Sequence, residues 1–423
     1  MTGMREFFVR LAGNAASINI IGLSAAALIP VAALPLVSRI YEPSTYGKFA
    51  IAFAFAAMAS TLITGRFEAA IVVPEDDRQG LSLAWLATLC ATKICVAALV
   101  IVTLTLYLKL WPSGGELYLL AVGAALFAAL TQVAANLAIR FRSFGTLAVA
   151  RVCGALCQVT FVLGLGLAGY GAPGLMAGFI AGYCVVVLVV GLRLKEPIVR
   201  NAPQKEGLVF AAKQHWRYPV MNMPSTAANT VATQLPLIWV GTFFGAQAAG
   251  QLGMLLRVWA GSAIVTKGVG EVFRIEAARE KGVTGRFPKS FRRAVAPMAV
   301  IALIVCAVLM TAGPMIFSSI LGTAWAPAGH IGATLAPFLC MQMIATTTSF
   351  SYLAGNRLGL LMTWQFGLLL ALLAGLAVAQ NFVGTPEAIY KTLSTIGLLM
   401  YAFYLFGAYK IAQGPGSTTE IGQ

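Results

Sequence analysis

Long apolar runs alternate with short polar segments along nearly the whole chain. A run of about 20 apolar residues is what an α-helix needs to cross the hydrocarbon core of a bilayer. Glycine, proline and charged residues separate the runs, so the pattern predicts about twelve membrane-spanning helices. We place these spans at residues 17–38, 47–65, 81–108, 117–138, 147–169, 173–192, 219–242, 248–270, 294–313, 330–354, 358–379 and 387–410.

Composition excludes the two or three soluble domains that a length of 423 residues would otherwise suggest. Apolar residues make up 59% of the chain and charged residues 10%, against about 45–50% and about 25% in soluble proteins. We expect the first run to stay in the protein, because it is too long for the apolar core of a signal peptide and lacks a small-residue cleavage site. The sequence therefore predicts an all-α integral membrane protein.

The net charge of +15 is explained by the orientation of the loops. With the N-terminus inside, 23 of the 29 Lys and Arg residues fall in cytoplasmic segments and four on the opposite side. Such an excess of Lys and Arg is typical of the cytoplasmic loops of membrane proteins. We therefore predict that both termini are cytoplasmic, and the basic excess does not indicate a nucleic-acid partner.

The two halves of the predicted helix order share a local pattern. The tripeptide Leu-Pro-Leu occurs at residues 34–36 and again at 235–237, and each copy is followed by a glycine that opens the next span, Gly47 and Gly250. Six spans in each half give a parallel repeat, related by an axis along the membrane normal. We predict an N-lobe over residues 1–192, a cytoplasmic linker over 193–218 and a C-lobe over 219–423.

Proline is concentrated in the first span of each half. Interior proline removes a backbone hydrogen bond and bends the helix, and in lipid the freed carbonyl groups must face protein or a water-filled cavity. One such proline is simply tolerated in a membrane helix. The concentration in equivalent spans favours hinges beside a cavity, at Pro30, Pro35, Pro224 and Pro236.

Two basic residues, Lys93 and Arg257, fall in the middle of apolar spans, where a charge costs roughly 2.5–3.5 kcal/mol. None of the fourteen acidic residues falls mid-span. Uncompensated cations favour an anionic ligand, and phosphate is the natural partner of arginine. Polar residues predict the lining of a cavity near these spans, although helix–helix hydrogen bonding is an alternative role for each of them. They are Asn19, Asn222, Asn229 and Gln234.

Other chemistry has little support in the sequence. No nucleotide-binding loop of the GxxxxGK[ST] type occurs. The seven cysteines all fall in apolar spans without a CxxC pair, so we interpret them as packing residues. We expect no catalytic residue, no metal site and no cofactor.

Two blocks of sequence resemble a known family. The segment "LPLVSRIYEPSTYGKFAIAFAFAAMASTLITGRFEAAIVVPEDD", from Leu34 to Asp77, resembles the second-helix region of Wzx-type oligosaccharide flippases of the MOP superfamily. The segment from His215 to Leu255 resembles the start of their second lobe. The resemblance implies a two-lobed bundle of the MOP or MATE kind and alternating access. It also implies a substrate of undecaprenyl diphosphate carrying an oligosaccharide.

The leading hypothesis is therefore a flippase for surface polysaccharide synthesis (O-antigen, capsule or exopolysaccharide) in the bacterial inner membrane. The diphosphate would dock on Arg257 and Lys93, with Arg66, Lys267 and Arg274 gathering it at the cytoplasmic mouth. We expect a monomer that works with a glycan polymerase and glycosyltransferases of the same pathway. The alternatives are a cation-coupled small-molecule exporter of the MATE type and a membrane glycan polymerase or ligase.

Overall fold

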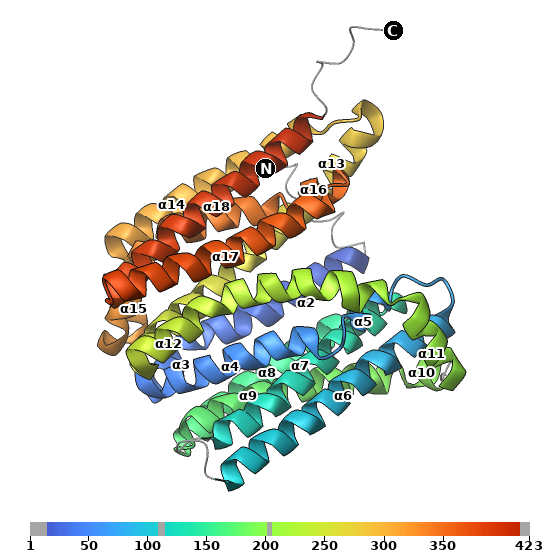
Figure 1. Cartoon of the computed structure of the whole chain (residues 1–423), viewed down its shortest axis with the longest axis horizontal. Helices are drawn as coiled ribbons and strands as arrows, with labels where there is room; N and C mark the ends of the chain where they lie inside the picture. Colours follow the sequence, from blue (N-terminus) through green and yellow to red (C-terminus); the bar gives the residue numbers. More distant parts are fainter. Residues whose placement is uncertain (1–14, 109–114, 201–204, 415–423) are drawn as a thin grey trace, which may run out of the picture. The chain divides into compact units, whose positions relative to one another are not determined.

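The protein is helical throughout the part that the computed structural model describes, residues 15–108, 115–200 and 205–414 (Figure 1). These ranges contain no β-strand. The chain divides into two compact units, Met1–Gly253 and Met254–Gln423. The predicted all-α fold with about twelve apolar helices is thus confirmed, while the cytoplasmic placement of the termini remains a prediction.

The first unit is built from a set of long helices with short connecting ones. Its core lies where α6 and α7 pack together, with α8 and α9 packed along each other beside them. The helices are α2 (Ala15–Ala32), α3 (Leu34–Ile40), α4 (Pro43–Leu62), α5 (Phe67–Ala70), α6 (Asp77–Tyr107), α7 (Glu116–Arg140), α8 (Phe144–Leu167), α9 (Gly171–Arg193), α10 (Lys195–Arg200), α11 (Lys205–Gln214), the π-helical turn η1 (Tyr218–Asn222) and most of α12 (Met223–Trp259).

The second unit begins in the last turns of α12. Helix α15 packs against both α14 and α18, and α17 packs against α18. The elements that follow α12 are η2 (Ala260–Ser262), α13 (Ala263–Thr284), α14 (Pro288–Leu321), η3 (Thr323–Trp325), α15 (Ala326–Thr347), α16 (Phe350–Ala354), α17 (Leu358–Phe382) and α18 (Pro386–Gln413).

Eleven helical stretches in the described ranges are long and apolar enough to cross a membrane. One of them, Tyr218–Thr284, contains two of the twelve predicted spans, 219–242 and 248–270. The two are nevertheless distinct, because Gly245 interrupts the helical backbone of α12 with φ 84° and ψ 175°. Only glycine adopts such a conformation readily. The sequence-based boundary between the two spans therefore falls at a real break in the helix.

The boundary between the two units lies further along the chain than the predicted linker at 193–218, because the segment up to Gly253 packs with the first unit. Gly47 of α4 and Gly250 of α12 allow this close approach, since a side chain on either glycine would overlap the backbone of the other helix. The predicted N-lobe, linker and C-lobe rest on the sequence repeat and remain a prediction.

The first predicted span, 17–38, is two helices in the structure. Helix α2 ends at Ala32, and α3 begins at Leu34 with Pro35 in its first turn, where a missing amide hydrogen costs nothing. Pro30 lies inside α2, one turn before the break. Proline therefore coincides with a break in this span, and a hinge motion there remains a prediction.

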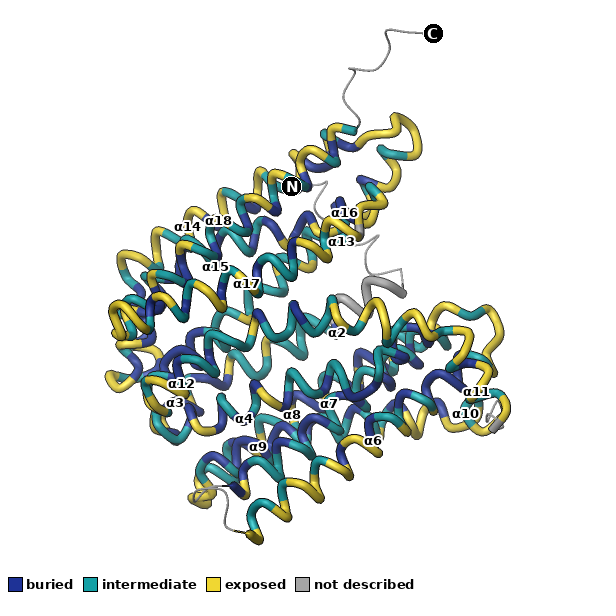
Figure 2. Tube along the Cα trace, in the orientation of Figure 1, coloured by how far each residue is buried: buried dark blue, intermediate teal, exposed yellow. Residues whose placement is uncertain are grey.

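Apolar side chains cover much of the outer face of the first unit. Helix α6 exposes residues along most of its length (Figure 2), among them Val96, Val100 and Ile101 with 55%, 61% and 61% of their surface accessible. In a soluble protein such a face would need a partner. In a helix long enough to span a bilayer, lipid chains cover it.

Candidate functional site

A sharp turn between α4 and α5 carries a cluster of polar residues. Gly65 and Arg66 both have left-handed backbone conformations, with φ of 61° and 62°. This conformation is common for glycine and rare for arginine. It reverses the chain so that the short helix α5 packs against α6, α7 and η1.

Arg66 joins two distant parts of the chain in this cluster. Its Nε donates a hydrogen bond to Oδ1 of Asn222 at 2.9 Å, across 156 positions of sequence. Its Nη1 forms an ion pair with Oε1 of Glu68 at 2.9 Å. Thr226 also donates to Oδ1 of Asn222, at 3.2 Å. Two of the predicted site residues, Arg66 and Asn222, are therefore in direct contact.

Glu68 is a residue of this cluster that sequence reasoning missed. Its side chain is only 2% exposed, and its second carboxylate oxygen, Oε2, is buried without a hydrogen-bond partner among the described residues. A buried carboxylate needs a compensating charge, which Arg66 supplies. The sequence places Glu68 outside the spans, and only its position two residues after Arg66 could have suggested the pair. Arg66 is thus a compensated cation in this structure.

Arg140, at the end of α7, holds the segment that connects α5 to α6. Its Nη1 donates to the carbonyl oxygens of Ile71 at 2.7 Å and Pro74 at 2.9 Å. Its Nη2 pairs with Oδ1 of Asp77 at 3.0 Å, and its side chain is 5% exposed. A side chain on Gly80 would overlap the Arg140 guanidinium, so the glycine makes room for it. Arg140 therefore fixes the position of α5 and of Glu68.

The remaining predicted residues of the first unit lie apart from this cluster. Lys93 is on the exposed face of α6, with Leu89, Val96 and Val100, rather than on the face that carries the buried Ala91 and Cys95. Along α12, Asn229 and Gln234 are half-buried, as is Pro236, whereas Pro224 is exposed near the start of the helix. Asn19 belongs to α2, but its side chain lies outside the described residues.

Three predicted cations belong to the second unit. Arg257 is half-buried near the end of α12, and Lys267 and Arg274 are exposed on α13. Lys267 and Arg274 are seven residues apart, a spacing that places them on one helix face. Arg274 forms an ion pair with Glu271, in which its Nε donates to Oε2 at 3.0 Å. Arg274 is therefore partly neutralised, as Arg66 is in the first unit.

In the described ranges, no group of three or more His, Cys, Asp or Glu side chains is arranged so that it could hold a metal ion. The site residues are cations and amides, and two of the cations, Arg66 and Arg274, are paired with carboxylates. Such groups bind and orient an anionic or hydroxyl-rich ligand through charge-assisted hydrogen bonds.

Comparison with solved structures identifies the fold as that of MOP-superfamily transporters. An inward-facing multidrug-resistance MATE transporter of this superfamily matches with 15% identity and a TM-score of 0.58, over 93% of this chain and 94% of that chain. A mutant of the Vibrio cholerae MATE transporter VcmN matches with 12% identity and a TM-score of 0.59, over 94% and 95%. A MOP superfamily transporter from Pyrococcus furiosus, described by the reverse polarity of its binding pocket, matches with 15% identity and a TM-score of 0.54, over 94% of each chain.

A match to the sequence model of a protein family shows the family of this chain. The model described as "Polysaccharide biosynthesis protein" matches residues 36–329, and the chain belongs to this family. No curated protein matches the sequence. The predicted polysaccharide-biosynthesis family is therefore confirmed, and the fold is that of transporters of the MOP superfamily.

Proposed function

We propose that the protein is a flippase that moves undecaprenyl-diphosphate-linked oligosaccharide from the cytoplasmic to the periplasmic leaflet of the bacterial inner membrane, by alternating access. The observation that carries this proposal is the combination of a polysaccharide-biosynthesis family with a transporter fold. A polysaccharide pathway that builds its units on a lipid inside the cell needs a transporter to bring them across the membrane.

The charges of the membrane spans support an anionic substrate. The candidate membrane spans α6 and α7 carry acidic residues only in their first turn. A negative charge there stabilises the helix through its dipole. Arg257 is half-buried near the end of α12. We propose that the diphosphate docks on Arg257, with Lys267 and Arg274 beside it on α13. The transporter from Pyrococcus furiosus, with its pocket of reverse polarity, indicates that this fold accommodates pockets of different charge.

Polar groups of η1 and α12 would hold the glycan. Asn222 ends the turn η1 directly before α12, and Asn229 and Gln234 follow within α12. Amide side chains both donate and accept hydrogen bonds, which suits the hydroxyl groups of sugars. The lipid tail would stay in the bilayer while the head group crosses.

The test is export of glycan in cells whose own copy of the gene is deleted. We expect the wild-type chain to restore surface polysaccharide and Arg257→Ala to reduce it at equal protein level. Arg293→Ala, which removes an exposed cation of α14 outside the proposed site, is the matched control. Normal surface polysaccharide in the deletion strain itself would contradict the proposed function.

A second candidate function is a cation-coupled exporter of small molecules, which the likeness to multidrug MATE transporters favours. The same strain distinguishes the two. An exporter predicts greater sensitivity to toxic cations with intact surface polysaccharide. A flippase predicts the loss of polysaccharide, with lipid-linked oligosaccharide accumulating on the cytoplasmic leaflet.

A further inference from the structure

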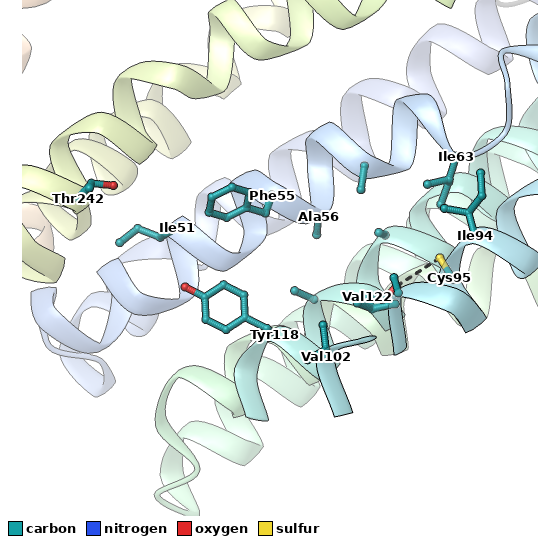
Figure 3. Close-up of a pocket in the computed structure, with 15 residues that line it drawn as sticks. Ile51, Phe55, Ala56, Ile63, Ile94, Cys95, Val102, Tyr118, Val122 and Thr242 are labelled. Carbon is teal, nitrogen blue, oxygen red and sulfur yellow. Dashed lines mark hydrogen bonds between the residues drawn. The ribbon is translucent and has the colours of Figure 1, made fainter. Parts of the chain in front are cut away.

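An apolar cavity of about 550 Å³ lies inside the first unit. Its walls are formed by α4, α6 and α7, with Gly241 and Thr242 of α12 also in the lining, and Thr242 lies at one end (Figure 3). None of the residues proposed for glycan or diphosphate binding lines this cavity. It is therefore a separate feature that the proposed function does not use.

The chemistry of the walls fits a hydrocarbon. Among the described lining residues, only Tyr118 and Thr242 carry a hydroxyl group and only Cys95 a thiol. The Cys95 thiol already donates to the carbonyl oxygen of Val122, with 3.8 Å between sulfur and oxygen. Most of the surface is aliphatic, so a ligand gains apolar burial and dispersion contacts there rather than hydrogen bonds.

The cavity is elongated along the helices. Its lining extends from Ile51 of α4 to Ile63, the residue that caps the end of α4, which corresponds to about 18 Å of helix at 1.5 Å per residue. This is more than half of the ~30 Å thickness of a bilayer's hydrocarbon core. A slot of this length, parallel to membrane-spanning helices, is long enough for much of an extended lipid chain.

The cavity opens to the surface of the unit. Phe55 and Ile94, which lie on its opposite walls, are 43% and 49% exposed. Helices α4, α6 and α7 are all candidate membrane spans, so this apolar opening lies between helices long enough to cross the bilayer. An acyl chain would enter the slot from the bilayer.

A cation lies one turn beyond the cavity on the same face of α4. Lys48 precedes Ile51 by three residues and Phe55 by seven, the spacing of one helix face. Side chains in an α-helix lean toward its N-terminus. The Lys48 side chain therefore leans away from the apolar slot, toward the start of α4. It is exposed and makes no ion pair with a described residue. A long lysine side chain in this position reaches the level of the lipid head groups.

We propose that this cavity is a binding site for an anionic phospholipid, with one acyl chain in the slot and the phosphate paired with Lys48. The apolar walls select a hydrocarbon chain, and the cation selects a negative head group. The site is independent of the proposed transport function.

The test uses the purified full-length protein in a neutral detergent, with retained lipid counted by native mass spectrometry. Phosphatidylglycerol and phosphatidylcholine of the same chain length are titrated separately. We expect the wild type to prefer phosphatidylglycerol. Lys48→Gln should lower the protein's affinity for phosphatidylglycerol about fivefold. This factor corresponds to the loss of about 1 kcal/mol, the contribution of one lysine near a charged lipid surface. Affinity for phosphatidylcholine should stay unchanged.

Filling the slot tests the position of the chain. Ala98→Phe on α6 and Ala59→Phe on α4 project into the cavity from two walls, and both should abolish retention of either lipid. Val100→Phe, on the exposed face of α6, is the matched control and should behave as the wild type. Thermal unfolding of each variant separates a filled site from a misfolded protein.

Three results would overturn the proposal. One is normal lipid retention by both filled variants, and another is equal loss in Val100→Phe. The third is displacement of phosphatidylglycerol by a polyprenyl phosphate at lower concentration, which would assign the slot to the tail of a transported lipid. None of these measurements depends on glycan export, so failure here leaves the proposed function to its own test.

Discussion

Gly47 and Gly250 contact each other, and each lies against the same kind of backbone atoms of the other helix. A side chain on Gly47 would lie 2.8 Å from the amide nitrogen of Gly250 and overlap the carbonyl oxygen of Ala246. A side chain on Gly250 would lie 3.1 Å from the amide nitrogen of Gly47 and overlap the carbonyl oxygen of Pro43. Ala246 and Pro43 each precede their glycine by four residues. Such reciprocity is what a twofold axis produces, and it supports the internal repeat in which the sequence pairs these two glycines.

The first prediction concerns this contact. Gly47→Ala or Gly250→Ala should force α4 and α12 apart and lower the free energy of unfolding by about 1–3 kcal/mol, as overpacked sites do. Thermal unfolding of the purified protein in detergent measures the loss. The control is Gly145→Ala on α8, where an added side chain meets nothing within 4 Å. It should leave stability equal or slightly raised, because alanine favours helix. Equal stability in all three variants would show that the helices are not in contact.

A second prediction tests the ion pair between Arg66 and Glu68. Glu68→Gln keeps the shape of the side chain but leaves Arg66 without a counter-charge. We expect a loss of about 1–3 kcal/mol, below the value for a fully buried pair because Arg66 is 19% exposed. Replacing both residues with Gln should cost less than the sum of the single changes. Glu271→Gln, which breaks the more exposed pair with Arg274, is the control and should cost less than about 0.5 kcal/mol. Strict additivity at Arg66 and Glu68 would contradict the pair.

A third prediction concerns Arg140. Arg140→Lys keeps the charge but loses the planar fork that binds two carbonyl groups and Asp77 together. Residues 71–76 should then exchange their amide hydrogens faster, because carbonyl groups that lose a partner destabilise the local fold by about 1–3 kcal/mol. Hydrogen–deuterium exchange detects this change. In Arg142→Lys, where the arginine is exposed, exchange in the same segment should match the wild type.

A fourth prediction separates the two cations that the sequence places mid-span. Arg257→Ala should lower glycan export, since Arg257 carries the proposed diphosphate site. Lys93→Leu should leave export near the wild-type level, because Lys93 lies on the exposed apolar face of α6. Export of surface polysaccharide by each variant, at matched protein level, provides the measurement. A loss in Lys93→Leu as large as in Arg257→Ala would place Lys93 in the substrate path.

The spans could be predicted from the sequence because lipid imposes a length and an apolar composition on every helix that crosses it. The internal repeat remains a prediction, which the close contact between Gly47 and Gly250 supports. The buried state of Glu68 was not visible. It depends on a left-handed turn at Gly65 and Arg66 and on packing of α5 against η1. These two segments are far apart in the sequence, since 156 positions separate Arg66 from Asn222. The exposed position of Lys93 depends likewise on which face of α6 packs against α7. Tertiary contacts of this kind leave no periodic signal.

The length of α14 has a consequence for the membrane in which the protein works. Its 34 residues correspond to about 51 Å of helix, well beyond a hydrocarbon core of ~30 Å. A helix that exceeds the bilayer must tilt or project beyond it, and each ångström of mismatch has a small cost. The exposed Arg292 and Arg293 near its start would then stand at or above the head groups. Bilayer thickness, through the tilt it imposes on α14, therefore becomes a physical variable to which this protein should respond.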